Sequence, residues 1–327
     1  MAQKSTTIYL KDSMATIQQK LDSSTSVKFQ KGIYKITKQL KLNSNTLVNL
    51  NGSTLRRCAS IQSIFINKVT KNTTKYDGSG SIVIQNGIFE GMGGYSYDNL
   101  VTLFHAKDVR IENVTFKDSL CHGLEINSSC KVVVNDCKFL GYNLEGTDYS
   151  YRELIQIDHA GAGSFFLKGS STASVCYDGT PCNNVVISNC LFNKSEFRDY
   201  PYACIGNHTQ LYKGKPHTNI TIVNNEFHCK QSSLKQPCLS FISMTDVVVK
   251  NNKFDCDCVA RIYSKAESYK LSGTKVNYAK GDGVCSDINI TDNMITCGQK
   301  AAFKQSYKSG KKHTKITLKP NQFDWAK

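Results

Sequence analysis

The sequence lacks long apolar segments, and it is poor in proline, methionine and tryptophan, with 5, 5 and 1 among 327 residues. Its apolar runs last only a few residues, as at Val132–Val134, whereas a transmembrane helix needs about 20. The sequence therefore argues against a membrane-spanning protein. Its 40% of hydrophobic residues also argues against a collagen-like or disordered chain. The segment Met1–Ser5 has none of the apolar character of a signal peptide, so no secretory leader is visible.

Acidic residues are the minority among the charges. Lys and Arg number 41 and Asp and Glu 26, which gives a net charge of +15. Most of the lysines stand singly, apart from groups such as Lys35, Lys38 and Lys41. A diffuse charge of this kind favours a weak field for anionic partners over the concentrated stripe of a nucleic-acid-binding protein. We therefore expect no nucleic-acid partner.

The 14 cysteines include no Cys-x-x-Cys unit. Cys256 and Cys258 are too close in sequence to form a zinc pair by themselves, and no matching pair of histidines follows. We predict no metal and no cofactor, and we interpret most cysteines as reduced core residues. The alternative is a set of disulfides, for which Cys176 and Cys182, on either side of a turn, are the first pair to test.

A short phrase recurs along the chain, with apolar residues followed by Asn or Asp, then two residues, then Phe or Ile. This pattern is typical of a strand that ends at a bend, because Asn tolerates the left-handed conformation. On stacked coils we expect the Asn side chains to form a ladder and the Phe rings an interior stack. The seven copies end 23 to 53 residues apart and span 86–89, 113–116, 136–139, 189–192, 224–227, 251–254 and 292–295.

The repeat resembles the right-handed parallel β-helix of the pectate-lyase-like superfamily, over roughly Thr25 to Phe323. The opening segments 15–21, 26–36 and 40–52 resemble the capping helix and first coils of that superfamily. The resemblance implies an all-β solenoid with a short N-terminal capping helix, whose best candidate is Ser13–Leu21. We predict a single domain over residues 1–327, with a cap over 1–24, coils over 25–323, and loop insertions near 142–182 and 194–216.

A second set of strands between these phrases carries the candidate site. When Leu124 and Ile126 are aligned with Ile155 and Ile157, the intervening polar residues point outward. Asn127 and Asp158 then share one column, which Asn207 joins if Asn207-His208 aligns with Asp158-His159. Glu125, Gln156 and Arg261 form a second column two residues away.

This geometry predicts a pair of catalytic carboxylates, Glu125 and Asp158. Rungs about 4.8 Å apart and two residues along a strand place them roughly 8 Å apart, within the range of an inverting glycosidase. His159 or His208 would tune the carboxylates or bind substrate. The alternative is an ordinary solvated strand face.

The expected substrate-binding residues are polar groups on this face and aromatic residues of the long loops, which could wall a sugar-binding cleft or simply pack on the coil. Asp178, within Asp178–Pro181, is better explained as a turn residue, and we assign His105, His217 and His313 to the surface or to loops. The expected substrate-binding set is Gln156, Asn127, Asn207, Glu153, Arg261, Arg152, Tyr151, Tyr177, Asp178 and Tyr202.

These residues lead to the hypothesis of a carbohydrate-active protein that hydrolyses an acidic polysaccharide. One alternative is a lyase, with His208 as base and Arg261 neutralising a uronate. Another is a non-catalytic phage or cell-surface module that binds glycans. The polygalacturonase motifs of the superfamily are not intact in this sequence. Arg261-Ile262-Tyr263 is only partly similar to one of them. The resemblance implies an extracellular, cell-surface or virion location and allows a homotrimer.

Overall fold

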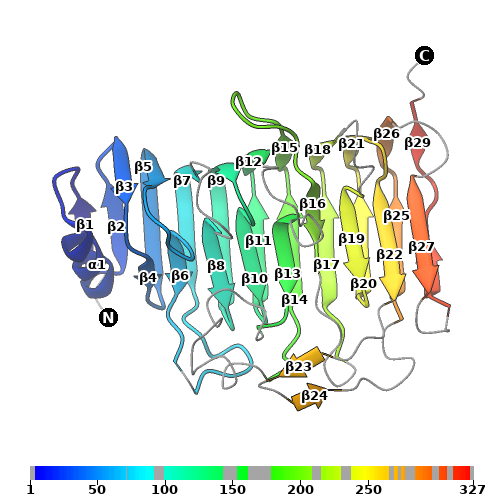
Figure 1. Cartoon of the computed structure of the whole chain (residues 1–327), viewed down its shortest axis with the longest axis horizontal. Helices are drawn as coiled ribbons and strands as arrows, with labels where there is room; N and C mark the ends of the chain where they lie inside the picture. Colours follow the sequence, from blue (N-terminus) through cyan, green and yellow to red (C-terminus); the bar gives the residue numbers. More distant parts are fainter. Residues whose placement is uncertain are drawn as a thin grey trace.

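The computed structural model describes residues 4–70, 72–91, 99–142, 153–160, 178–207, 215–229, 237–264, 269–271, 274–276, 284–296, 302–307 and 312–324. The chain is an all-β, right-handed parallel β-helix, as the repeat predicts. Its strands stack side by side along the long axis, from β1 near the N-terminus to β27 and β29 at the other end (Figure 1).

Two parallel sheets form the walls of the coil. The long sheet contains β1 (Ser5–Ile8), β2 (Ser26–Phe29), β3 (Ile33–Ile36), β5 (Thr46–Arg57), β7 (Ile82–Glu90), β9 (Lys107–Ser119), β11 (Cys130–Asn135), β12 (Lys138–Tyr142), β14 (Asn183–Ser188), β15 (Leu191–Asn193), β17 (Thr218–Val223), β18 (Glu226–Cys229), β20 (Thr245–Lys250), β21 (Lys253–Cys256), β25 (Ser286–Thr291), β26 (Met294–Thr296), β28 (Thr314–Thr317) and β29 (Gln322–Phe323). The short sheet contains β4 (Leu40–Leu42), β6 (Phe65–Asn67), β8 (Val101–Phe104), β10 (Leu124–Asn127), β13 (Glu153–Asp158), β16 (Ala203–Gly206), β19 (Leu239–Ile242), β22 (Ala260–Ser264) and β27 (Phe303–Tyr307). A separate antiparallel pair joins β23 (Tyr269–Leu271) and β24 (Thr274–Val276).

The repeated Asn or Asp makes the bend within the long sheet. In all seven phrases, and also at Asn51, this residue has a φ between 51° and 62°. Such left-handed backbone is accessible to Asn and Asp at lower cost than to most other side chains. The predicted bend is therefore confirmed, and it explains why these two residue types recur.

The interior on the side of the bends is a stack of phenylalanine rings. Phe139 lies between Phe116 and Phe192, with ring centroids 4.7 and 4.8 Å away and the rings nearly parallel. The stack continues in both directions, through Phe89 at one end and through Phe227 and Phe254 at the other. This confirms the predicted Phe stack.

The buried asparagine ladder lies one residue beyond its predicted position. Its rungs are Asn225, Asn252, Asn293 and Asn321, and each of them directly follows a residue at a bend. Their side chains are joined by hydrogen bonds of 2.9–3.0 Å. The prediction that the bend residues themselves form a ladder holds between Asn86 and Asn113, where the amide of Asn113 donates to the Oδ1 of Asn86 at 3.0 Å, but it is wrong for these later coils. Left-handed backbone turns the side chain of the bend residue away, so the residue that follows occupies the interior.

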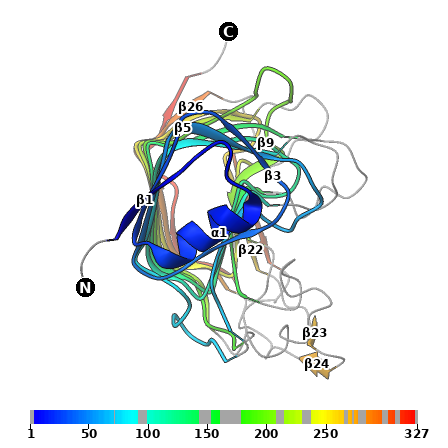
Figure 2. The same cartoon turned by 90° about the vertical axis from the view of Figure 1, so that its left-hand side faces the viewer.

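The helix α1 (Met14–Ser23) covers the N-terminal end of the coil, where Figure 2 shows it lying across the opening. The Ser13 hydroxyl caps the helix by accepting a hydrogen bond from the backbone N–H of Thr16. Ile17 and Leu21 are buried against the first coils. The predicted capping helix is confirmed, and the apolar interior is thereby shielded from water at this end.

The twelve cysteines that the structure describes are free thiols, and eleven of them are buried. This agrees with the interpretation of cysteine as core filling. Cys182 is a buried thiol whose Sγ donates to the carbonyls of Ile126 and Asp158, both at 3.3 Å. The proposed pairing with Cys176 lies outside the described residues. Within the part of the chain that is described, no helix combines the length and apolarity needed to cross a membrane.

Candidate functional site

The short sheet brings the predicted polar residues into two columns. Asn127 pairs with Asp158, and Glu125 with Gln156, on the neighbouring strands β10 and β13. The second column continues from Gln156 through Gly206 and Ser240 to Arg261. The alignment on Leu124, Ile126, Ile155 and Ile157 thus gives the right register, because these apolar residues all belong to the core.

The expectation of a solvated face is wrong for the middle of this sheet. All residues of β10 and β13 are buried, including Glu125, Gln156 and Asp158, with exposed fractions of 2%, 6% and 1%. Alternation along a strand assigns a side chain to one side of the sheet, but it does not reveal what covers that side.

Asn207 does not join the column of Asp158. Ile155 pairs with Ile205 and Gln156 with Gly206, so Asn207 falls one position short of Asp158. Its side chain instead accepts a hydrogen bond from the N–H of Ile242 and donates one to the same residue's carbonyl, both at 2.8 Å. Asn67 makes the same pair of bonds with Phe104. Asn207 is therefore a structural residue that ties successive coils together.

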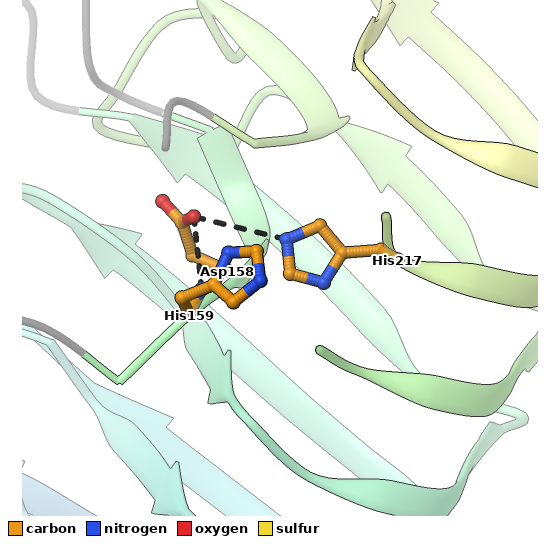
Figure 3. Close-up of side chains that lie close together, drawn as sticks. All are labelled: Asp158, His159 and His217. Carbon is orange, nitrogen blue, oxygen red and sulfur yellow. Dashed lines mark hydrogen bonds and ion pairs between the residues drawn. The ribbon is translucent and has the colours of Figure 1, made fainter. Parts of the chain in front are cut away.

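A buried polar cluster surrounds Asp158 (Figure 3). Its Oδ1 accepts a hydrogen bond from the N–H of His159 at 3.0 Å and lies 3.9 Å from Nε2 of His217. Its Oδ2 accepts a bond of 2.7 Å from the amide of Gln156. The rings of His159 and His217 are 4.3 Å apart. Candidate ligand atoms of Asp158, His159 and His217 all lie within 4.8 Å of one another.

Hydrogen bonding fixes the proton of His217. The N–H of Cys182 donates to its Nδ1 at 2.9 Å, so the proton of the neutral ring sits on Nε2, the atom that faces Asp158. A protonated Nε2 has no lone pair for a cation. In this conformation the cluster is an acid–imidazole arrangement, and His217 is not available as a metal ligand.

Burial also keeps both histidines uncharged. It lowers the pKa of His159 to about 4, against the opposing effects of a hydrogen bond to the Lys215 backbone and the charge of Asp178. Burial, followed by the neighbouring His159, lowers the pKa of His217 well below its ordinary value. Both rings are therefore neutral at pH 7.

The carboxylate of Glu125 belongs to a separate network. Its Oε2 accepts hydrogen bonds from the amide of Asn99 and, at 3.3 Å, from the hydroxyl of Thr102. Thr102 also receives a bond of 3.1 Å from Ser63. Glu125 is held by donors from preceding coils, whereas Asp158 is held by Gln156 and His159. The two carboxylates stand on neighbouring rungs of the short sheet.

The part of the second column that reaches solvent is basic. Arg261 and Ser240 are partly exposed, and Lys304, the register partner of Arg261 on β27, is exposed. The guanidinium of Arg261 lies over the ring of Tyr263, 4.5 Å from its centroid. We name Ser240, Arg261 and Lys304 the basic end of the short sheet.

The remaining predicted residues have more local roles. Asp178 accepts hydrogen bonds from the N–H groups of Lys75 and Thr180. Burial by itself would raise the pKa of Asp178, but these hydrogen bonds hold it below the ordinary value. It acts as a turn residue that connects two loops. Tyr202 packs against the hydrophobic core, and Glu153 is buried at the start of β13. Tyr151, Arg152, Tyr177 and His208 lie outside the described residues.

Sequence reasoning missed the third member of the polar cluster. His217 and His105, both assigned to the surface or to loops, are buried, whereas His313 is partly exposed. His217 stands directly before β17 in the long sheet, and only the closure of the coil brings it to Asp158 in the short sheet. The sequence contained a signal for the position of His217. Cys182 and His217 each stand directly before a strand of the long sheet, β14 and β17, so they occupy equivalent positions.

Comparison with known proteins supports the fold. No family model matches the chain. A curated relative, plasmin and fibronectin-binding protein A of Streptococcus pneumoniae, is 31% identical over 174 residues, which make up 52% of this chain but only 22% of that protein. The crystal structure of PfbA, a surface adhesin of Streptococcus pneumoniae, matches with a TM-score of 0.70 and 21% identity, covering 98% of this chain and 80% of the other.

An enzyme has the same architecture. The exopolygalacturonase of Thermotoga maritima matches with a TM-score of 0.60 and 9% identity, over 95% of this chain and 78% of the enzyme. At such low identity the similarity establishes the architecture alone. The chain thus shares the parallel β-helix fold of these proteins.

Proposed function

We propose that this chain is a surface-associated β-helix module that binds an acidic polysaccharide at the basic end of its short sheet. The observation that carries the proposal is the direct pairing of Arg261 with Lys304 on neighbouring strands. Like charges in this arrangement repel and cost stability, and a bound anion would remove that cost. The net charge of +15 would attract such a ligand over a longer range.

The geometry of Arg261 suits recognition of a uronate. A guanidinium offers a fork of donors that matches a carboxylate, and the ring of Tyr263 beneath it restricts its orientation. Ser240 adds a hydroxyl on the next rung. The carboxylates of Glu125 and Asp158 are buried, so the cations rather than the acids are the groups this face offers to solvent.

The relatives support a binding role at a surface. PfbA is a surface adhesin, and the curated relative is named for the proteins it binds. An extracellular, cell-surface or virion location would place the basic end among acidic glycans.

We expect Arg261→Ala to weaken binding to polygalacturonate about 10-fold or more, because hydrogen bonds to charged groups contribute about 1.5–3 kcal/mol each. Binding would be measured by calorimetry, with neutral dextran as a second ligand. Arg110→Ala is the matched control, since Arg110 is an exposed arginine on the long sheet. Equal affinity of wild type and Arg261→Ala, or equal binding of dextran, would contradict the proposal.

Hydrolysis is a second candidate, favoured by the positions of Glu125 and Asp158 on neighbouring rungs, two residues apart along the strand. This offset suits a general acid and a base with a water between them. Asp158→Asn should then abolish sugar release from a glycan panel analysed by mass spectrometry, and circular dichroism would check that the variant is folded, because Asp158 is buried and hydrogen-bonded. Products carrying an ultraviolet-absorbing double bond would indicate a lyase. No product from the wild-type protein over a long incubation would leave binding as the function.

A further inference from the structure

Two buried side chains beside Asp158 have polar atoms without a hydrogen-bond partner among the described residues. They are the amide of Asn127, at both Nδ2 and Oδ1, and the ring of His217, at Nε2. Asn127 is 0% exposed and His217 is 1% exposed. Buried polar groups in folded proteins are nearly always paired, because an unpaired one costs its full desolvation free energy. These atoms therefore call for a partner.

The two side chains approach Asp158 from different sheets. Asn127 and Asp158 are register partners on β10 and β13, and both lie on the outer side of the short sheet, opposite the core residues Ile126 and Ile157. Rungs about 4.8 Å apart place the Asn127 amide next to the carboxylate. His217 comes from the long sheet, with its Nε2 at 3.9 Å from Oδ1 of Asp158 (Figure 3). This distance is too long for a direct hydrogen bond but suits two groups bridged by one small molecule.

The hydrogen-bonding capacities of these groups select a neutral ligand. Because Nδ1 of His217 accepts from the N–H of Cys182, its Nε2 carries a proton and needs an acceptor. This N–H offers no lone pair to a cation, and the carboxylate of Asp158 repels an anion. The amide of Asn127 has both donors and an acceptor. A neutral molecule that both donates and accepts fits all three residues.

We propose that Asn127, Asp158 and His217 enclose an internal water molecule. The water accepts a hydrogen bond from Nε2–H of His217, donates one to Oδ1 of Asp158 and bonds to the amide of Asn127. This gives it the roughly three bonds that are typical of a buried water. A sugar hydroxyl has the same chemistry, but its ring would need an opening to solvent, which side chains only 0–1% exposed do not provide.

The water site joins the two walls of the coil. Asn127 and Asp158 end strands of the short sheet, whereas His217 stands directly before β17 of the long sheet. The water completes a hydrogen-bonded chain from the N–H of Cys182 through the His217 ring to Asp158. This site holds without reference to the basic end of the short sheet, so it stands or falls independently of polysaccharide binding.

A high-resolution crystal structure of the wild-type protein tests the site. We expect a density peak that refines as water, about 2.7–3.2 Å from Nε2 of His217, from Oδ1 of Asp158 and from the amide of Asn127. In solution, NMR should show a nuclear Overhauser contact between the Nε2 proton of His217 and water. The site would be overturned by an empty position, a protein atom in that position, a direct bond between His217 and Asp158, or a peak that refines as a metal ion.

A substitution tests the part played by Asn127. Asn127→Leu removes the amide at nearly constant size, and we expect the water peak to weaken or vanish and the melting temperature to fall. Asn67→Leu is the matched control, because Asn67 is also buried on the short sheet but both its amide atoms bond to the backbone of Phe104. This control should keep the water peak.

Two results with Asn127→Leu would count against the site. A melting temperature above that of the wild type would show that the amide of Asn127 is buried without a partner, since removing such a group stabilises a protein. An unchanged water peak would exclude Asn127 as a partner of the water. If Asn127→Leu does not fold, the peak in the wild-type structure still decides.

Discussion

Replacing Phe139 with Ala is expected to lower the free energy of unfolding by about 3–5 kcal/mol, the usual cost of deleting a buried aromatic side chain. Phe139 is fully buried and stacks on Phe116 and Phe192 from the neighbouring coils. Its loss opens a cavity and interrupts the stack at one point. Because each coil contacts only its neighbours, the two halves of the solenoid would be coupled less strongly. Guanidinium unfolding followed by circular dichroism measures the effect.

Phe197→Ala is the matched control for this substitution. Phe197 is 70% exposed, and its one described ring contact is with the ammonium of Lys117, 5.0 Å from the ring centroid. We expect a change below about 1 kcal/mol. A similar loss of stability in both variants would show that the Phe stack is not a main source of stability. A second, separate unfolding transition in Phe139→Ala alone would support the coupling between coils.

Lowering the pH from 7 to 4 is expected to remove about 3 kcal/mol of stability through His159 alone. The folded pKa of this residue is about 4, and its unfolded value is about 6.5. Between these values the unfolded chain binds more protons than the folded one, so stability falls as the pH falls through this window. The contribution is complete above pH 6.5. His217, whose pKa is also lowered by burial, acts in the same direction.

The test compares the pH dependence of unfolding in wild type and His159→Gln. Glutamine is polar but does not titrate, so the slope between pH 4 and 6.5 should flatten. His228→Gln is the control, because His228 lies at the surface beside Glu226 and Asp255. The groups that face His159 are Asp158, His217 and Asp178, and the other acids titrate equally in both proteins. An unchanged slope in His159→Gln would contradict the assignment.

The middle strands and the later strands of the short sheet carry different chemical groups. Its middle contains the buried acids Glu125 and Asp158, each held by its own donors, whereas its later strands present Arg261 and Lys304. A carboxylate without access to water is a poor candidate for activating one. A paired cation beside solvent is a good candidate for holding an acidic sugar. This contrast is why we rank binding above hydrolysis.

The sequence predicted the features that depend on local backbone chemistry. The repeated Asn or Asp specified the bends, because few other residues adopt left-handed backbone at low cost. The Phe three residues later specified the interior stack, and the apolar alternation of β10 and β13 specified their register. Each of these signals lies within a few residues of the chain, so a single repeat unit carries it.

Only the tertiary structure decided what each surface of the sheet meets. Alternation placed Asp158 outside the coil, but its burial beside His217 follows from how separate turns close upon each other. Asn207 left the predicted column because Ile205 entered the core. The sequence by itself thus determined a coil and its bends, whereas the stacking of the coils decided which chemical groups come together, because contacts between turns join residues that are distant along the chain.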